Sequence, residues 1–388
     1  GGRWHPVLAE NMTEEQLKEV ERLKSIGYLA GSSSAPEVYG VTVYDSTRTW
    51  DGLNFYTSGH FAGAVLMDMR GRVLHEWRHT FMDAWRAGPG GELPKSSKGS
   101  GFWRRAYLFE NGDVLAIFDG HAIIKIDKDS NLIWARFGGY HHDMDVVDDG
   151  RIYVLMREPG IIPAISSEHP VLEEFVVVLD ADGNELRRFS QLSAIARSEF
   201  SGLLEGMKDS GDIFHTNTIE VLDGRFEDRD PAFREGNILI CIRELDNIAI
   251  IDPDTELAVW GTEGPWLKQH QPTFLDEGHM LIFDNGGSRQ ASRVLEFDPV
   301  TREITWAYTG DAEHPFYSPQ CGSNQRLPTG NTLISETDRG RAIEVTKDGE
   351  IVWEYINPAQ AGGEGEFIAS LFEVIRLPRD YVSGWLSK

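Results

Sequence analysis

The sequence has few cysteines and little positive charge. Its 388 residues include two cysteines, Cys241 and Cys321, too few for a disulfide-built scaffold, and sequence alone does not assign them as bonded. Acidic residues number 62 against 37 basic ones, for a net charge of -25. A surface this negative repels nucleic acid and anionic membranes, so we expect no nucleic-acid partner. Any local cluster of basic side chains becomes a candidate anion site.

Long apolar runs and several well-known catalytic motifs are also missing. No run approaches the ~20 apolar residues that span a bilayer, and no charged-then-apolar leader begins the chain, which predicts a soluble globular protein as given. The sequence has no glycine-rich phosphate loop before a helix, no Gly-x-Ser-x-Gly and no Cys-x-x-Cys. These absences disfavour a nucleotide-dependent transferase and a serine hydrolase, and we expect no cofactor.

Residues 1–36 differ in pattern from the rest of the chain. Thr13 to Gln16 fits a capping box, and Leu17, Val20 and Leu23 follow at helical spacing, which predicts an amphipathic helix over residues 13–26. A linker rich in Gly and Ser follows over residues 27–36. We expect this N-terminal arm to pack on the main domain, or to contact a partner protein, another subunit of a homo-oligomer or a membrane anchor.

From about residue 38 onward, two kinds of β-hairpin alternate. The first kind has an apolar strand, an acidic turn and a second strand that often carries Trp; its six copies span 63–77, 123–134, 176–189, 248–260, 294–306 and 342–353. The second kind has a more uniformly apolar return strand; its copies span 106–118, 145–155, 217–240, 269–285 and 325–334, with a half-copy at 372–378. A repeat of this kind indicates a repeat architecture.

Two hairpins make four strands, so six alternating pairs predict an all-β fold, a six-bladed β-propeller over residues 37–388. The outer strands at 64–78 and the inner strand at the end of the chain are expected to complete one blade together, which hides exposed strand edges. Insertions at 79–101, 157–174, 190–213 and 223–235 are expected to be loops or short helices on the propeller faces.

Histidines recur at one repeat position. The first strand of each inner hairpin lines the central channel, and counting back eight residues from the turn glycine aligns Arg104, His142, His270 and Gly322. His215 takes the same place in the copy whose turn is expanded by the 223–235 insertion. We therefore predict that His142, His215 and His270 lie at one level in a channel mouth.

Amide and basic side chains are expected at the same mouth. Asn217 is two residues after His215, hence on the same strand face, and Arg243 ends the antiparallel return strand beside His215. Three further basic residues begin neighbouring inner strands: Arg104, Arg105 and Lys268. Together these donors predict an anion site. Three imidazoles also resemble a catalytic zinc arrangement, although Arg243 nearby would oppose a cation.

The motifs in this order resemble the arylsulfotransferase family. They are Gly63 to Trp77, His141-His142-Asp143, Phe214-His215-Thr216-Asn217, Cys241-Ile242-Arg243, Gln269-His270-Gln271 to Phe283-Asp284-Asn285, and Gln325 to Leu333. The resemblance implies a six-bladed propeller that moves a sulfuryl group from an aryl sulfate to a phenolic acceptor without a nucleotide donor. It implies that His270 is transiently sulfated, and that His142, His215, Asn217 and Arg243 hold the sulfuryl oxygens. It also implies a periplasmic or extracellular location.

Two other functions are compatible with the residues themselves. A metal-assisted lyase or hydrolase could use the three histidines as ligands in the same mouth. A propeller that binds a ligand or assembles with a partner, without turnover, would present a similar surface. The three readings differ in whether His270 acts as a nucleophile, a ligand or a binding residue.

Overall fold

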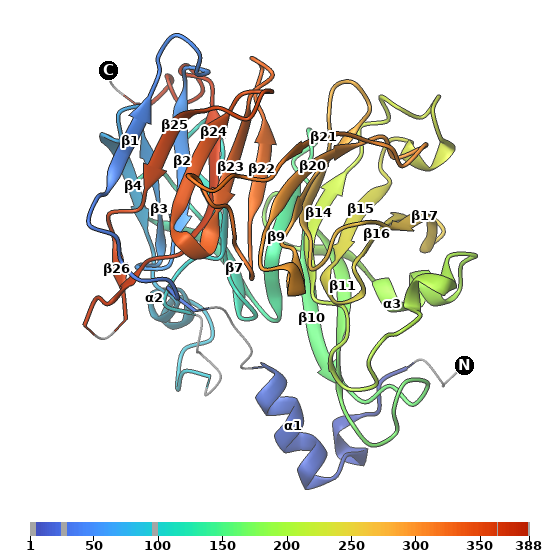
Figure 1. Ribbon diagram of the computed structural model, residues 1–388. Helices are drawn as coiled ribbons and strands as arrows, with labels where there is room; N and C mark the ends of the chain where they lie inside the picture. Colours follow the sequence, from blue (N-terminus) through green and yellow to red (C-terminus); the bar gives the residue numbers. More distant parts are fainter. Residues whose placement is uncertain (1–4, 25–28, 95–99, 363, 387–388) are drawn as a thin grey trace.

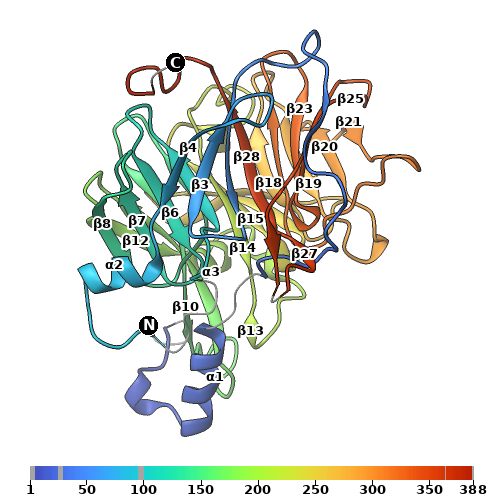
Figure 2. The ribbon, with the colours of Figure 1, turned by 90° about the vertical axis from the view of Figure 1, so that its left-hand side faces the viewer.

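The short alternating strands and acidic turns fold into antiparallel sheets arranged around a common axis. The computed structural model describes residues 5–24, 29–94, 100–362 and 364–386. In this part of the chain, six antiparallel sheets of four main strands form a β-propeller, seen edge-on in Figures 1 and 2. The predicted all-β, six-bladed fold is thus confirmed.

Each blade runs from an inner strand at the channel to an outer strand at the rim. The first blade contains β28 (Leu371–Leu377), β2 (Leu53–Ser58), β3 (Gly63–Met67) and β4 (Val73–Arg78). The second contains β5 (Arg105–Leu108), β6 (Val114–Phe118), β7 (Ala122–Ile126) and β8 (Leu132–Phe137). The third contains β9 (Tyr140–Val146), β10 (Ile152–Gly160), β11 (Val171–Leu179) and β12 (Glu185–Ser190).

The remaining blades repeat this order. The fourth contains β14 (Thr216–Val221), β15 (Ile238–Ile242), β16 (Asn247–Asp252) and β17 (Leu257–Glu263). The fifth contains β18 (His270–Phe274), β19 (Met280–Asp284), β20 (Arg293–Phe297) and β21 (Ile304–Tyr308). The sixth contains β22 (Ser323–Arg326), β23 (Thr332–Glu336), β24 (Arg341–Val345), β25 (Ile351–Ile356) and, outermost, β1 (Gly40–Tyr44).

The two ends of the chain close the ring twice. The C-terminal strand β28 pairs antiparallel with β2, which supplies the return strand that the last half-copy lacks. In addition, β1 pairs with the outer strand β25 of the sixth blade. Because both sequence ends are paired into sheets, the blades that would otherwise carry free edges are covered.

The insertions contain the expected short helices and loops, but two of them also contain strand. Helices α2 (Phe81–Ala87) and α3 (Gln191–Ala196) lie in the first and third insertions; residues 95–99 of the first fall outside the described part of the chain. The 157–174 insertion, predicted as loop or short helix, is partly strand: β10 and β11 continue into it and pair Arg157 with Glu174. Strand β13 (Gly211–Asp212) then adds in parallel to β11. Pairing across β10 and β11 satisfies backbone groups that a loop would leave to water.

The predicted N-terminal helix is present as α1 (Glu14–Lys24); Ser25 and Ile26, its expected end, lie outside the described residues. Thr13 and Gln16 exchange hydrogen bonds as a capping box, and Val20 and Leu23 are buried. Figure 1 shows α1 standing off one face of the propeller. The described part of the predicted linker is docked on the propeller, since Ser370 N–H donates to Ala30 O and Ile368 N–H donates to Ser33 O. In the described residues, no helix is both long and apolar enough to cross a membrane.

Carboxylates on the inner strands join one blade to the next. Asp143 and Asp145 on β9 accept the backbone N–H groups of Ile219 and Val221 on β14, at 3.0 and 2.7 Å. Glu220 on β14 likewise accepts the N–H of Phe274 on β18, at 3.1 Å. Burial raises the pKa of Asp145 to about 6 and, with the charge of Asp145, that of Glu220 to about 8. Glu220 therefore holds a proton at neutral pH, whereas Asp145 is mostly ionised.

The raised pKa of Glu220 predicts a pH-dependent stability. An unfolded glutamate loses its proton near pH 4, so between that pH and about 8 the folded state keeps a proton that the unfolded state has lost. Stability should then fall as pH rises through this window. Glu220→Gln keeps an acceptor for Phe274 and removes the ionisation. We expect the variant to melt a few degrees above the wild type at pH 8, and by a smaller margin at pH 5. Thermal melts of both, with exposed Glu227→Gln as control, test this; parallel pH curves for wild type and Glu220→Gln would contradict it.

Candidate functional site

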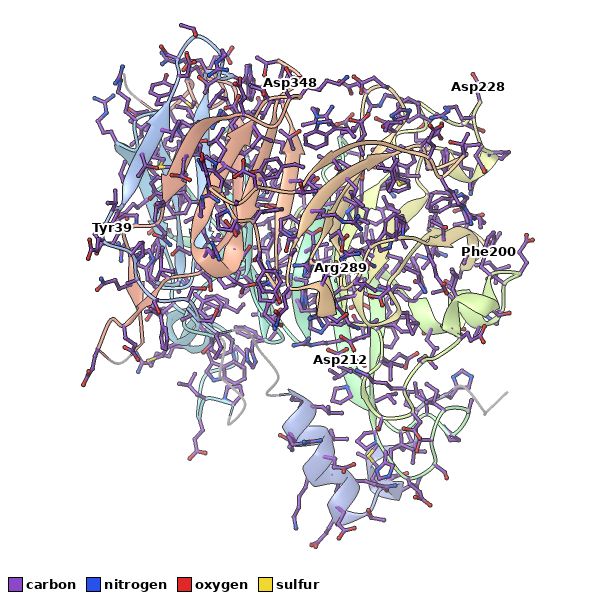
Figure 3. The ribbon with its side chains drawn as sticks, viewed as in Figure 1. Tyr39, Phe200, Asp212, Asp228, Arg289 and Asp348 are labelled. Carbon is purple, nitrogen blue, oxygen red and sulfur yellow. The ribbon has the colours of Figure 1, made fainter. Side chains whose placement is uncertain are left out.

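The aligned histidines gather at the channel mouth that faces α1. His142 is in β9, His215 directly precedes β14, and His270 is the first residue of β18. Asp212, next to His215, lies on the α1 side of the propeller, whereas Asp228 and Asp348 lie at the opposite face (Figure 3). His142 and His270 are buried, and the Nε2 of His142 meets the Nε2 of His215 from the next blade. The repeat register therefore placed these residues in one region.

The backbone at this level is strained in a way that the repeat did not predict. His142, His215 and Gln271 have φ values of 53, 48 and 50°, in the left-handed region that residues with a Cβ rarely occupy. The pairing of the three inner strands that carry these residues also shifts register here, for example between Thr216 and Thr218. The alternation expected for His215 and Asn217 is thus interrupted. Such outliers concentrate at functional sites, where they aim side chains that regular strands would not.

The hydrogen bonds of His270 fix its tautomer. The Nδ2 of Asn285 donates to the backbone oxygens of Ser318 and Cys321, at 2.7 and 2.9 Å, so its Oδ1 must face His270. His270 Nδ1 lies 2.7 Å from that Oδ1 and 3.1 Å from the backbone oxygen of Lys268. Both oxygens only accept, so Nδ1 carries the proton. The lone pair is then on Nε2, which is buried and makes no hydrogen bond to any described residue.

The surroundings of His270 keep it neutral. Burial is the largest cause that holds its pKa well below the ordinary value, followed by the positive charges of Arg243 and Arg104. The hydrogen bond to Asn285 acts in the opposite direction but is outweighed. A buried neutral imidazole with its lone pair on Nε2 and two guanidiniums nearby is suited to attack an anion that those guanidiniums attract.

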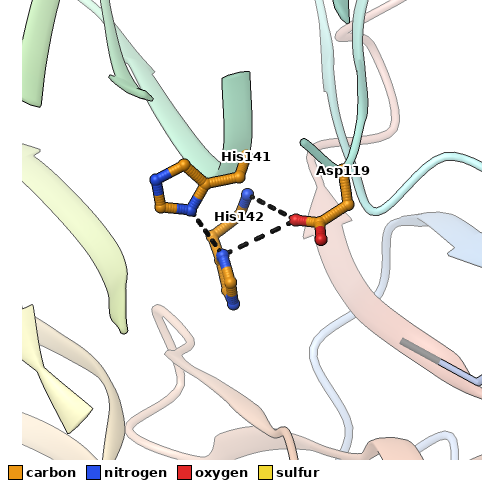
Figure 4. Close-up of side chains that lie close together, drawn as sticks. All are labelled: Asp119, His141 and His142. Carbon is orange, nitrogen blue, oxygen red and sulfur yellow. Dashed lines mark hydrogen bonds and ion pairs between the residues drawn. The ribbon is translucent and has the colours of Figure 1, made fainter. Parts of the chain in front are cut away.

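His142 and His215 touch one another across the junction between the third and fourth blades. Their Nε2 atoms are 3.2 Å apart, and His215 Nδ1 lies 2.6 Å from Asp212. On its other side, His142 Nδ1 lies 2.6 Å from the Nδ1 of His141 and 3.6 Å from Asp119, as Figure 4 shows. His142 is therefore the middle member of a chain of polar contacts.

The metal hypothesis used His142, His215 and His270 as ligands, but a different group of residues comes close enough to hold a metal ion. Among the described residues, the group of three possible ligands whose atoms lie within 4.8 Å of one another is Asp119, His141 and His142, without His215 or His270. The two Nδ1 atoms in it are 2.6 Å apart and so share a proton, and Asp119 already pairs with Arg157 at 3.3 Å. These residues are arranged as a hydrogen-bonded group around His142.

The predicted basic residues separate into two groups. Arg104 is buried, and its guanidinium lies 5.1 Å above the ring of Phe372 and 3.6 Å from the sulfur of Cys321. Its positive charge lowers the pKa of both His142 and His270. Arg243 begins a short turn after β15 and donates to Glu244 at 2.6 Å. Lys268, half-buried, is 3.6 Å from the same carboxylate. Arg104 and Arg243 thus bring positive charge to His270.

Arg105, predicted to bind substrate, is instead committed to a structural role. It pairs with Asp143 at 3.1 Å and with Glu373, and it donates to Gln271 at 3.0 Å, which ties four inner strands together. Arg105 also donates to the backbone oxygen of His142 at 3.3 Å, so its contacts lie among the inner strands. Asn217, also predicted to bind substrate, donates one amide N–H to the backbone oxygen of Gln269 at 2.8 Å and so positions the residue before His270.

A cavity of about 300 Å³ opens at the mouth. His215, Asp119, Arg157 and Asp338 supply its polar lining, while Cys321, Phe372 and Leu29 are apolar. Leu29 and Ser32 belong to the N-terminal arm, so the arm forms part of the cavity wall. The cavity combines an apolar surface with polar groups beside the histidines, as sites for small aromatic anions do.

Several residues of this site were not predicted. Asn285 directly follows β19, the partner of β18, just as Arg243 directly follows β15. Its position in the hairpin is therefore a signal in the sequence. Asp212 precedes His215 by three residues, a local signal. Asp119 and Glu174 had no signal, because each comes from a different hairpin and reaches the histidines only in the folded ring.

The fold and the site define a six-bladed propeller with a histidine-rich channel mouth. The family model described as Arylsulfotransferase (ASST) matches residues 105–358, more than half of the chain. The chain therefore belongs to the arylsulfotransferase family, as the motifs indicated. No curated protein sequence matches the chain significantly.

Solved structures resemble this chain at low sequence identity. A protein of unknown function from Bacteroides caccae is 12% identical with a TM-score of 0.52, over 83% of this chain and 98% of that chain. The Dos1 propeller is 11% identical with a TM-score of 0.42, over 86% of this chain and 76% of that chain. The virginiamycin B lyase from Staphylococcus aureus is 12% identical with a TM-score of 0.38, over 66% and 69%. The first of these likenesses concerns the fold alone.

The tautomer of His270 can be tested directly. With histidines labelled with ¹⁵N, His270 should show a neutral ring with the proton on Nδ1, and it should stay neutral at pH 6 because burial and two arginines hold its pKa low. Asn285→Ala removes the acceptor at 2.7 Å and should increase the exchange of His270 between tautomers. Assignment uses the signal lost in His270→Gln. An imidazolium signal, or a proton on Nε2, would contradict the geometry.

Proposed function

We propose that this protein transfers a sulfuryl group from an aryl sulfate to a phenolic acceptor by a ping-pong mechanism, with His270 as the nucleophile. The observation that carries the proposal is the state of His270, whose proton is held on Nδ1 by Asn285 and whose Nε2 is buried without a hydrogen bond to a described residue. Membership of the arylsulfotransferase family supports the substrate class.

The reaction would begin with attack of His270 Nε2 on the sulfur atom. The bond from sulfur to the aryl oxygen breaks, a phenolate leaves, and a sulfohistidine remains. A second phenol then attacks the same sulfur and restores the free histidine. Covalent catalysis divides one difficult transfer into two easier ones, and the neutral state of His270 keeps the nucleophile available.

The site has groups to stabilise the charge that develops. Arg243 and Arg104 place positive charge beside His270, and the contacts of His142 and His215 supply a hydrogen-bond donor. Preorganised donors of this kind contribute roughly 3 kcal/mol each to an acyl-transfer transition state. Phe372 and Leu29 offer the aryl group an apolar wall in the cavity. The natural donor and acceptor would be small phenolic compounds, and the family resemblance supports a periplasmic or extracellular site of action.

The proposal predicts a covalent intermediate on one residue. Wild-type protein incubated with 4-nitrophenyl sulfate should release nitrophenolate in a burst and gain the mass of one SO₃ group, which tandem mass spectrometry should place on His270. His270→Ala should form no adduct and should lose at least about 1,000-fold in transfer to phenol, since it removes the attacking atom.

His279→Ala is the matched control, because His279 lies at the turn of the same hairpin and pairs with Glu296 away from the mouth. It should keep the burst and the adduct. Full transfer by His270→Ala would overturn the proposal. A wild-type protein that binds the aryl sulfate without forming an adduct would indicate a binding propeller instead.

A further inference from the structure

Five side chains form a continuous line from the protein interior to the cavity. His141 Nε2 lies 2.7 Å from Glu174, the Nδ1 atoms of His141 and His142 are 2.6 Å apart, the Nε2 atoms of His142 and His215 are 3.2 Å apart, and His215 Nδ1 is 2.6 Å from Asp212. The first contact is an ion-pair contact rather than an aligned hydrogen bond. Glu174, His141 and His142 are buried, whereas His215 reaches the cavity wall.

The four contacts need more protons than the neutral groups supply. At the three hydrogen bonds, two lone pairs would face one another at 2.6 to 3.2 Å unless a proton lay between them. At the fourth contact, His141 Nε2 and the Glu174 carboxylate would be two acceptors 2.7 Å apart unless one of them carried a proton. A neutral imidazole carries one N–H and a carboxylate none, so three neutral histidines and two carboxylates supply three protons for four contacts. The complete chain therefore contains a fourth proton and has one negative charge instead of two.

The two ends of the chain favour different protonation states. Burial, followed by the negative charge of Asp212, raises the pKa of Glu174 well above its ordinary value. Burial lowers the pKa of His141 and of His142. Burial alone would raise the pKa of Asp212, but the charge of His215 and its hydrogen bond hold it below the ordinary value. The fourth proton can thus rest at Glu174, the buried end of the chain.

We propose that the chain of Glu174, His141, His142, His215 and Asp212 stores the proton that passes between the two half-reactions of sulfuryl transfer. This inference rests on the proposed function. In the first half-reaction, His270 Nε2 bonds to sulfur, the sulfur–oxygen bond to the aryl group breaks, and the aryl oxygen takes the proton held between His142 and His215. In the second, the acceptor oxygen bonds to sulfur, the nitrogen–sulfur bond breaks, and the phenolic proton returns to the chain.

His141 and Glu174 act through their neighbours in this scheme and do not touch the substrate. After the proton between His142 and His215 leaves, Glu174 passes its proton to His141 Nε2, and His141 Nδ1 passes its proton to His142 Nδ1. His142 thus stays neutral and Glu174 becomes ionised, while the contact between His142 and His215 waits for the proton of the second half-reaction. A rotation of the Glu174 carboxyl group aligns its contact with His141. The first half-reaction thus leaves the chain with three protons, and the second restores four.

Charged groups around the chain hold it in place. Asp119 accepts the backbone N–H of His142 at 3.3 Å and pairs with Arg157 at 3.3 Å. Arg157 lies opposite Glu174 in the pairing of β10 with β11, and its charge opposes the rise in the pKa of Glu174. Arg104 acts on His142 from the second blade. These fixed charges leave Glu174 and the three histidines as the groups that exchange the proton.

Glu174→Gln tests the proposal, because the amide keeps the size of the side chain but cannot pass a proton. Two aryl sulfates with leaving groups of different basicity distinguish a loss of proton transfer from a general loss of activity. 4-Nitrophenyl sulfate has a leaving group that is stable as an anion, whereas 4-methylphenyl sulfate releases a phenolate as basic as that of tyrosine, with a pKa of about 10. For sulfuryl transfer to His270, we expect the variant to lose on the order of 100-fold with the methylphenyl donor and little with the nitrophenyl donor.

Glu173→Gln is the matched control, since Glu173 is the adjacent buried glutamate on β11. It points to the opposite face of the strand, where it accepts a hydrogen bond from the Ser190 hydroxyl. It should behave as the wild type with both donors. Equal losses with the two donors in Glu174→Gln would overturn the proton store while leaving sulfuryl transfer intact. Failure of the wild type to form the adduct would instead count against the proposed function and, with it, against the role of the chain.

The proton count has a test that needs no substrate. Because the four-proton chain has one negative charge wherever its proton rests, Glu174→Gln, with three neutral histidines and ionised Asp212, should have the same net charge as the wild type. Capillary electrophoresis of the folded proteins at pH 7 compares the net charge of the variant with that of the wild type. A wild type more negative by one charge would show a chain of three protons and would overturn the proposal.

Discussion

The propeller depends on how its inner strands satisfy the backbone groups that face the next blade. An inner strand has a paired neighbour on its outer side only, so its other edge would be exposed in the channel. Asp143, Asp145 and Glu220 accept these N–H groups across blade junctions, and Gln325 exchanges hydrogen bonds with the backbone of Arg376 across the closing junction. Polar side chains thus replace a strand in holding the ring together.

The tryptophans of the outer hairpins join neighbouring blades at the rim of the propeller. Trp77, Trp134, Trp306 and Trp353 each donate from the indole nitrogen to a backbone oxygen in a turn of the next blade, at 2.7 to 3.1 Å. Trp353 donates to Met69, which closes the ring from the sixth blade to the first. Each indole also buries apolar surface between blades, so packing and hydrogen bonding fix the same spacing. These contacts at the inner edge and at the rim hold neighbouring blades at a fixed spacing and so keep the geometry of the channel mouth.

The site is built from residues that depart from regular strand geometry and from an apolar interior. The left-handed residues His142, His215 and Gln271 interrupt the inner strands at one level, and the buried Glu174 and His141 carry polar groups into a region that apolar residues could fill. Strain and buried polarity of this kind lower stability and are retained where a function needs them. The ring of inter-blade contacts provides the stability that offsets this cost. The same scaffold holds His270 in one tautomer through Asn285 and its two backbone acceptors.

The sequence by itself determined the repeat, the number of blades, the closure by both ends of the chain and the level at which His142, His215 and His270 lie. Alternating hairpins and turn glycines carry that information locally. Only the tertiary structure decided which neighbour each side chain meets. It separated Arg104 from Arg105, extended β10 and β11 through a predicted loop, and brought Asp119 and Glu174 to the histidines from distant hairpins. The physical reason is that a repeat fixes position along the axis, whereas contacts across blade junctions depend on side-chain direction, local bulges and burial.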